Sequence, residues 1–347
     1  MDKQTQSIIA RQVEDAMTAF RDGWGVLKKR GPSQLQFWFL ALLIGIAAGF
    51  AALLFRKSIT WLQSTVYGAE DIRAIHTFAE TLPWWLVLVV PILGGLVVGL
   101  IFHLFTPDGR VRSVADVIEG AAMHDGRVEV KAGLASAAAS LITLSTGGST
   151  GREGPVVHLA AIISTKVSDW IDARGITGRD LMGCAVAAAV SASFNAPIAG
   201  TLFALEVVLR HFAVHAFAPI AIAAAAGTVI NRLEFGGLTE YTLAEEGTLQ
   251  FYVELPAFLL LGLVSGLVAV VFMRAIFWSE DTGTWLQTRL RIHGILRPAI
   301  AGAILGAIAL AYPHIIGVGY ETVSAALTGN LLLHEAIVFT IIKTVAV

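Results

Sequence analysis

The sequence predicts an all-α protein that crosses a lipid bilayer several times. Of its 347 residues, 56% are hydrophobic and only 14% are charged, whereas soluble domains carry about 25% charged residues. The mean hydropathy is +0.72, and long stretches contain no charge. Hydrogen bonding inside lipid then requires helices, because no alternating pattern of barrel strands is visible. We therefore predict a polytopic helical membrane protein.

The composition also excludes other classes of protein. A formal net charge of −2 gives no basic excess for binding nucleic acid. The one cysteine, Cys184, cannot form an intramolecular disulfide, which excludes a disulfide-linked secreted scaffold. So few charged residues are incompatible with a soluble enzyme or a disordered chain. The 34 glycines suit close packing of helices in lipid.

The N-terminal half contains three predicted apolar helices. Residues 1–33 are amphipathic: the segment is polar overall, but its apolar residues recur at helical spacing. It is expected to form an interfacial or cytoplasmic helix. Leu35–Phe55 follows with 21 uncharged residues, which matches a hydrocarbon core of about 30 Å. Trp84–Phe102 begins with two tryptophans that are typical of interface anchors. Ala132–Gly151 is again uncharged and is rich in alanine, serine and glycine.

The later apolar stretches are less regular. Leu181–Leu205 is interrupted by Asn195-Ala196-Pro197, and His211–Asn231 contains Pro219. After a polar loop come three more stretches, Leu255–Met273, Pro298–Ala311 and residues 331–347. Broken helices at membrane depth are tolerated where they line a cavity, and they are typical of transport sites. The interruptions therefore favour a transport protein over a continuous helical scaffold.

The basic residues predict the orientation of the chain. Six lysines and arginines precede the first apolar stretch, three lie between residues 56 and 83, and four lie between residues 103 and 131. Cytoplasmic segments carry the excess of lysine and arginine in membrane proteins. The sequence therefore favours a cytoplasmic N-terminus.

One segment carries the candidate chemistry. Between residues 132 and 165 the only formal charges are Arg152 and Glu153, within Gly147-Gly148-Ser149-Thr150-Gly151-Arg152-Glu153-Gly154-Pro155. Pro155 suits the first turn of a helix, so the backbone N–H groups of that helix start should point into the glycine-rich turn. Such a helix start attracts anions. The Glu153 carboxylate could occupy the same place and leave it on protonation, which would make it a gate.

This segment also fits two other interpretations, a helix cap and a phosphate-binding loop. Glu153 could instead cap the helix and pair with Arg152. At membrane depth, however, ionisable residues usually have a function, which favours the gate. A phosphate-binding P-loop requires Lys and then Ser or Thr after the last glycine. Arg152 and Glu153 stand there instead, so we set the P-loop aside.

Several segments together resemble one family of membrane proteins. Gly151-Arg152-Glu153-Gly154-Pro155 is followed about forty residues later by Phe194-Asn195-Ala196-Pro197-Ile198-Ala199-Gly200 and Leu202-Phe203-Ala204-Leu205-Glu206. Gly317-Val318-Gly319-Tyr320 follows later. These segments are similar to those of the CLC chloride channel and transporter family, from about Gln34 to the last residue. The resemblance implies an inverted repeat of tilted and broken helices, a homodimer in the plasma (inner) membrane, chloride as the transported ion and no cofactor.

The resemblance also implies roles for particular residues. Glu153 matches the gating glutamate of the family. Gly151, Arg152, Gly154 and Pro155 match the helix-start motif whose backbone amides face the anion. Ser113 falls where the family has a serine that binds the central anion, but its family glycine and proline neighbours are replaced. Ser113 and Asp116 also fit a plain capping box, and both interpretations stay open here.

The expected proton pathway departs from the family pattern. Proton-coupled members usually have an acidic residue directly after the position of Glu206, where this chain has Val207. Valine cannot relay a proton, so we predict a passive channel or an uncoupled transporter. A proton-coupled antiporter is the alternative, because some coupled members manage without that acid. Glu206 matches a mainly structural glutamate and is expected to be buried at a helix end.

The second half of the inverted repeat is expected to be incomplete. Residues 34–232 match a first repeat, and residues 251–347 match only part of a second. The second-half Gly-x-Phe-x-Pro motif and a later anion-binding tyrosine of the family are absent, so the chain is expected to hold only part of the anion pathway. It would be a piece of a longer protein or act with a partner segment. A non-conducting structural or assembly subunit is the rival function of another class.

Enzyme and metal functions find no support in the sequence. His334-Glu335 could begin a zinc-protease motif, but the second histidine of that motif would fall at Val338. No nucleophile, base and orienting group occur together at a suitable spacing. We therefore predict no catalytic residues and no metal ligands.

Overall fold

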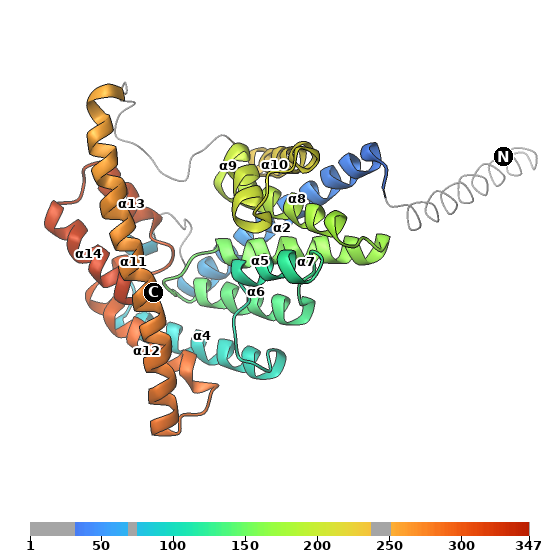
Figure 1. Cartoon of the computed structure of the whole chain (residues 1–347). Helices are drawn as coiled ribbons and strands as arrows, with labels where there is room; N and C mark the ends of the chain where they lie inside the picture. Colours follow the sequence, from blue (N-terminus) through green and yellow to red (C-terminus); the bar gives the residue numbers. More distant parts are fainter. Residues whose placement is uncertain (1–31, 69–74, 237–250, 347) are drawn as a thin grey trace, which may run out of the picture. The chain divides into compact units, whose positions relative to one another are not determined.

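The computed structural model describes residues 32–68, 75–236 and 251–346, and every regular element in these ranges is a helix (Figure 1). This confirms the predicted all-α fold. The helix expected within residues 1–33 lies outside the described residues, apart from its last two positions. The described residues divide into two compact units. The first lies within Met1–Leu53, Ser113–Gly133 and Val156–Gly237, and the second within Leu54–Arg112, Leu134–Pro155 and Leu238–Val347.

The helices are numbered along the chain as in Figure 1. The first of them are α2 (Gln34–Tyr67), α3 (Ile75–Glu80), α4 (Trp84–Phe105), α5 (Val114–Met123), α6 (Val130–Ser145), α7 (Glu153–Ile171), α8 (Ile176–Phe194), α9 (Pro197–Phe203), the π-helix η2 (Ala204–Leu209) and α10 (Val214–Phe235). The remaining ones are α11 (Phe251–Leu290), α12 (Leu296–Ala311), the 3-10 helix η3 (Pro313–Ile315), α13 (Tyr320–Leu327) and α14 (Leu333–Ala346).

In the first unit, α8 is the central helix and is buried along most of its length. Helix α10 packs closely against it, because a Cβ atom on Gly227 would lie 2.3 Å from the carbonyl oxygen of Ala188. The N-terminal part of α2 also approaches α10 closely, since a Cβ atom on Gly45 would lie 2.7 Å from backbone atoms of Ala223. Small residues thus bring three helix backbones together, as expected for packing in lipid.

The predicted interruption at Asn195-Ala196-Pro197 is confirmed. Helix α8 ends at Phe194, and Asn195 adopts a left-handed conformation with φ of 54°. The Nε atom of Arg232 donates a hydrogen bond of 2.7 Å to the side-chain oxygen of Asn195. Pro197 then begins α9, where its missing N–H group costs nothing.

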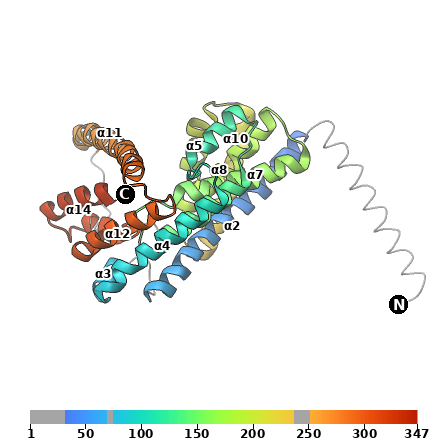
Figure 2. The ribbon, with the colours of Figure 1, turned by 90° about the horizontal axis from the view of Figure 1, so that it is seen from below.

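In the second unit, α4 and α12 pack against each other (Figures 1 and 2). A Cβ atom on Gly95 would lie 2.2 Å from the carbonyl oxygen of Pro298, and one on Gly302 would lie 2.2 Å from that of Pro91. Both helices carry the same pattern, Pro-x-x-x-Gly-x-x-x-Gly, which begins at Pro91 and at Pro298. The two backbones therefore touch through equivalent positions of the two helices.

A second internal similarity links α2 with α11. Each contains Gly-x-x-x-Gly, at Gly45 and Gly49 in α2 and at Gly262 and Gly266 in α11. The glycines of α2 face α10, whereas no described atom lies within 4 Å of a Cβ placed on either glycine of α11. The Gly-x-x-x-Gly pattern therefore packs against another helix in α2, whereas in α11 it faces open space.

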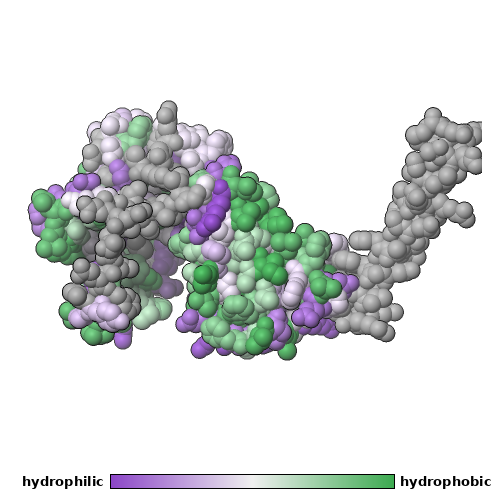
Figure 3. All heavy atoms as spheres, turned by 90° about the horizontal axis from the view of Figure 1, so that it is seen from above, coloured by the Kyte–Doolittle hydropathy of each residue, from purple (hydrophilic) through white to green (hydrophobic). Residues whose placement is uncertain are grey.

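Four helices among the described residues are long and apolar enough to cross a membrane, namely α2, α4, α10 and residues 254–290 of α11. Residues 130–145, 197–209 and 296–311 form shorter apolar helices. Figure 3 shows extensive apolar areas on the face turned to the viewer. Exposed leucine, phenylalanine and tryptophan side chains of this number are unfavourable in water, and they are suited to lipid.

Candidate functional site

The glycine-rich segment between α6 and α7 reverses the chain. Helix α6 ends at Ser145, and the N–H group of Gly148 bonds back to the carbonyl oxygen of Thr143 at 2.7 Å. Gly147 has a φ of +93°, a conformation that residues with a Cβ atom rarely adopt. Its carbonyl oxygen accepts a hydrogen bond of 3.2 Å from the N–H group of Gly317. The glycine at this position is thus required by the turn itself, and the predicted end of an apolar helix at the turn is confirmed.

Helix α7 begins at Glu153, so Pro155 lies in its first turn as the sequence predicts. The Glu153 side chain is half-buried. Its Oε2 atom lies 2.6 Å from the position that a Cβ atom on Gly151 would take. The carboxylate is therefore folded back over Gly151, at the positive end of the helix dipole, where a negative charge is stabilised. Gly154 next to it is half-buried and adds no side chain to this helix start.

Arg152 belongs to the second unit and packs against Tyr320 of the same unit. Its side chain is buried, and its guanidinium carbon lies 5.3 Å from the centre of the Tyr320 ring, a cation–π distance. Tyr320 is the first residue of α13. Arg152, which directly precedes Glu153, is thus packed against the start of α13, a segment far away in the sequence.

Ser113 lies in the first unit as the N-cap of α5. Its N–H group donates a 2.6 Å hydrogen bond to the Asp116 carboxylate, and its hydroxyl accepts a bond from the N–H group of Ala115 at 3.4 Å. The capping-box interpretation is therefore confirmed. Binding of an anion by Ser113 stays a prediction.

The cap predicts how Ser113 variants behave. Replacing an N-cap serine by alanine costs about 1 kcal/mol, whereas glycine costs only a few tenths. We expect Ser113→Ala to lower the free energy of unfolding by about 1 kcal/mol and Ser113→Gly by much less. Unfolding of the purified protein in detergent, followed by circular dichroism, measures both. Equal losses in the two variants would contradict capping as the role of the hydroxyl in stability.

The residue before this cap is held in an ion pair. The Nη1 atom of Arg112 lies 2.7 Å from the carboxylate of Asp108, in the loop that follows α4. This hydrogen bond is the main reason why the pKa of Asp108 is lowered from its usual value. The charge of Arg112 next to Ser113 is therefore partly balanced by Asp108.

Glu206 and Val207 lie on η2 in the first unit. Both side chains are exposed, so the expected burial of Glu206 is wrong. On η2 the buried side chains are those of Ala204, Leu205 and Val208, and Glu206 lies outside this packed face. Val207 offers no titratable group, in keeping with the sequence.

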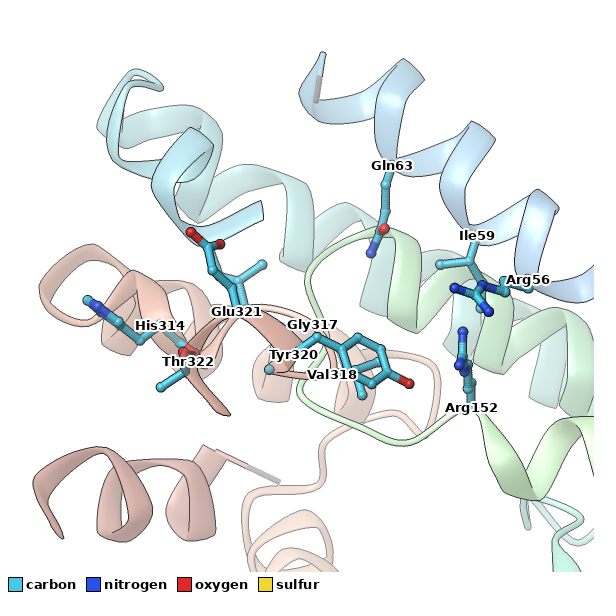
Figure 4. A pocket seen from close by; sticks show the side chains of 12 residues that line it. Arg56, Ile59, Gln63, Arg152, His314, Gly317, Val318, Tyr320, Glu321 and Thr322 are labelled. Carbon is cyan, nitrogen blue, oxygen red and sulfur yellow. Dashed lines mark hydrogen bonds between the residues drawn. The ribbon is translucent and has the colours of Figure 1, made fainter. Parts of the chain in front are cut away.

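A small cavity in the second unit was missed by sequence reasoning. It has a volume of about 30 Å³, and its walls include Arg56, Gln63, Arg152, Gly317, Tyr320 and Glu321 (Figure 4). Gln63 is only 3% exposed, and its side-chain N–H group donates a 2.9 Å hydrogen bond to the carbonyl oxygen of Leu144. The sequence signal for this cavity was the presence of Arg56 and Gln63 in a long, mostly apolar helix. Nothing in the sequence indicated that these two residues lie near Tyr320.

Comparison with known proteins gives a consistent result. Residues 94–347 match the family model described as voltage gated chloride channel. The putative chloride channel protein ClcB-like of Ralstonia nicotianae is 31% identical over 292 residues, which are 83% of this chain and 66% of that protein. Chloride channel protein CLC-f of Arabidopsis thaliana is 28% identical over 314 residues, 87% of this chain and 39% of that protein. The chain thus spans about two thirds or less of the length of these relatives.

Solved structures share the fold. A slow cyanobacterial Cl⁻/H⁺ antiporter superposes with a TM-score of 0.74 at 17% identity, over 91% of this chain and 72% of that one. A CLC-type fluoride/proton antiporter superposes with a TM-score of 0.70 at 21% identity, over 89% of this chain and 74% of that one. At this level of identity the likeness concerns the fold.

Proposed function

This chain belongs to the voltage-gated chloride channel family, and from that premise we propose that it lets chloride or a similar small anion cross the membrane along a path gated by Glu153. Membership of this family and the four long apolar helices found among the described residues make it an integral membrane protein. The observation that carries the gate is the position of the Glu153 carboxylate, folded over Gly151 at the start of α7.

In the proposed mechanism, the Glu153 carboxylate and the transported anion compete for the same position at the start of α7. An anion that leaves water must be compensated for its lost hydration, and backbone N–H groups at a helix start can do this. The carboxylate of Glu153 carries the same sign of charge and lies at that helix start. Protonation removes the charge and with it the attraction to the helix dipole. Anion flux should therefore rise as the pH falls.

The coupling to protons divides the proposal into two forms. We favour a passive channel or an uncoupled transporter, because Val207 directly follows Glu206 and cannot relay a proton. The alternative is a proton-coupled antiporter, the activity named for the two solved structures that share the fold. The rival of another class is a non-conducting structural or assembly subunit.

One liposome experiment separates these three. Vesicles containing the purified chain and a chloride gradient are monitored with a chloride electrode and a pH electrode. We expect chloride efflux above that of empty vesicles, with no proton movement driven by the gradient. Proton movement coupled to chloride would support the antiporter instead. Absence of efflux would support the non-conducting subunit.

The repeat organisation is also proposed. We infer that residues 34–232 form one membrane repeat and residues 251–347 part of a second. The glycine patterns shared by α2 and α11, and by α4 and α12, support this division. We further infer a homodimer in the plasma (inner) membrane with a cytoplasmic N-terminus, supported by the distribution of basic residues and by the resemblance to the family. No cofactor is proposed.

A further inference from the structure

The loop between η3 and α13 lies against the turn that precedes Glu153. The N–H group of Gly317 donates a hydrogen bond of 3.2 Å to the carbonyl oxygen of Gly147, at the start of that turn. Where the loop ends, the ring of Tyr320 lies 5.3 Å from the guanidinium carbon of Arg152, the residue before Glu153 (Figure 4). All of these residues belong to the second unit. The loop therefore contacts both ends of the segment that leads into the proposed gate.

The loop itself contains two glycines that restrict its backbone little. Gly317 has a φ of 69° and Gly319 has a φ of 94°. Glycine adopts such conformations readily, but it also loses the most conformational freedom when it is fixed in one of them. The conformation of this loop therefore depends on the groups that are bonded to it.

Lys343, in the last turn of α14, supplies two such bonds. Its Nζ atom donates a hydrogen bond of 3.0 Å to the carbonyl oxygen of Ile315 and one of 2.6 Å to that of Gly317. Lysines near the ends of apolar helices commonly extend toward water, whereas this ammonium group binds backbone. Hydrogen bonds from a charged donor are stronger than those between neutral groups. Gly317 is thus bonded through its carbonyl group to Lys343 and through its N–H group to Gly147.

We propose that Lys343 is a positioning residue for the gate: it fixes the loop at residues 316–319, and the loop in turn fixes the segment before Glu153. This inference rests on the function proposed above and adds a residue far away in the sequence. Lys343 acts through Gly317 and Gly147, and not by contact with the transported anion. The attraction between a helix start and a carboxylate falls off within the first turn of the helix. A segment that moves would therefore hold the carboxylate less firmly.

Hydrogen exchange measures this connection whether or not the chain conducts. Lys343→Met keeps a long side chain but removes its N–H donors. We expect the backbone amides of residues 316–319 and 148–152 to exchange about tenfold faster in this variant than in the wild type, with unchanged rates in α8. The matched control is Lys131→Met, which removes an exposed lysine near the start of α6 and should leave both segments at wild-type rates.

Each other outcome of this experiment has a definite meaning. Wild-type exchange of residues 148–152 in Lys343→Met would overturn the proposal, because the segment before the gate would then not depend on the lysine. An equal increase throughout the chain, α8 included, would also overturn it, because the lysine would then contribute only to general stability. Lys343→Arg keeps the charge and the donors and should restore the wild-type rates.

A second variant covers the case in which Lys343→Met does not fold. Lys343→Gln keeps two N–H donors without the charge, so it should accelerate exchange in the same two segments to a smaller extent. Wild-type exchange of residues 148–152 in Lys343→Gln would then contradict the proposal.

The pH dependence of chloride flux in liposomes tests the consequence for the gate. A carboxylate that is held less firmly at a helix start gains a proton at a higher pH. Half-maximal flux should therefore occur at a proton concentration about two to five times lower in Lys343→Met than in the wild type, and at the wild-type value in Lys343→Arg. The other charged residue of the segment, Arg152, is the same in all of these variants.

The two proposals fail in different ways. Flux through the wild type that does not depend on pH would refute the gate, and hydrogen exchange would still decide whether Lys343 fixes the segment. Flux that depends on pH with the same midpoint in the wild type and in Lys343→Met would refute the positioning role alone.

Discussion

Glu153→Ala should make chloride flux insensitive to pH and raise it at neutral pH to the level that the wild type reaches in acid. The reason is that the variant lacks the charge that occupies the start of α7. A carboxylate at a helix start is stabilised by up to about 2 kcal/mol, so the increase should be up to about thirtyfold. Chloride efflux from liposomes over a series of pH values measures both effects.

Two further variants make this experiment specific. Glu153→Gln keeps the shape of the side chain without its charge and should behave like Glu153→Ala. Asp172→Asn neutralises an exposed carboxylate just beyond the other end of α7, and it should keep the wild-type pH dependence. The gate would be refuted if flux through Glu153→Ala still followed pH as in the wild type.

Gly95→Val should destabilise the protein severely. A Cβ atom at this position would lie 2.2 Å from the carbonyl oxygen of Pro298. The obstacle is backbone, so α4 and α12 would have to separate along their contact. Overpacking of this kind costs 1–3 kcal/mol and sometimes more, and we expect a loss of about 3 kcal/mol in the free energy of unfolding. Chemical unfolding in detergent measures it.

The matched control lies on α11. Gly262 is also a helical glycine within an apolar stretch, but no described atom lies within 4 Å of a Cβ placed on it. Gly262→Val should therefore change the stability of this chain by no more than about 0.5 kcal/mol. A similar loss in both variants would show that the cost reflects the helix itself and not the contact between α4 and α12.

Features that depend on neighbouring residues could be predicted from the sequence. The chain reversal at Gly147, the helix start at Glu153 and the interruption at Asn195 follow from the conformational preferences of glycine, proline and asparagine. The cap at Ser113 follows from the spacing between its side chain and that of Asp116. Each is decided within a few residues, so the sequence alone contains the necessary information.

Helix lengths were predicted less well. Helix α2 continues to Tyr67, well beyond the predicted end at Phe55, and α11 continues to Leu290. The prediction counted residues without charge, because these are compatible with lipid. A helix does not end where its lipid-compatible part ends, since charged residues such as Arg56 are also good helix formers. The length of an uncharged stretch therefore underestimates the length of the helix that contains it.

Contacts between distant segments could not be predicted. The cavity joins Arg56, Arg152 and Tyr320 from three separate parts of the chain. Sequence reasoning assigned Arg152 to the helix-start motif, noted Tyr320 only for its resemblance, and gave Arg56 no role. Glu206 is likewise exposed because Ala204, Leu205 and Val208 form the packed face of η2. Packing, and not local preference, decides these features.

The contact between α4 and α12 has a consequence for how mutations can be rescued. Where a large side chain presses on another side chain, a smaller residue on the partner can restore the fit. At Gly95 and Gly302 the nearest atoms are carbonyl oxygens, which every residue type carries. A second substitution on the facing helix therefore cannot relieve the clash, because the clashing atoms do not belong to a side chain. Suppressor screens starting from variants of these glycines should return reversion to glycine, and not compensating substitutions across the pair.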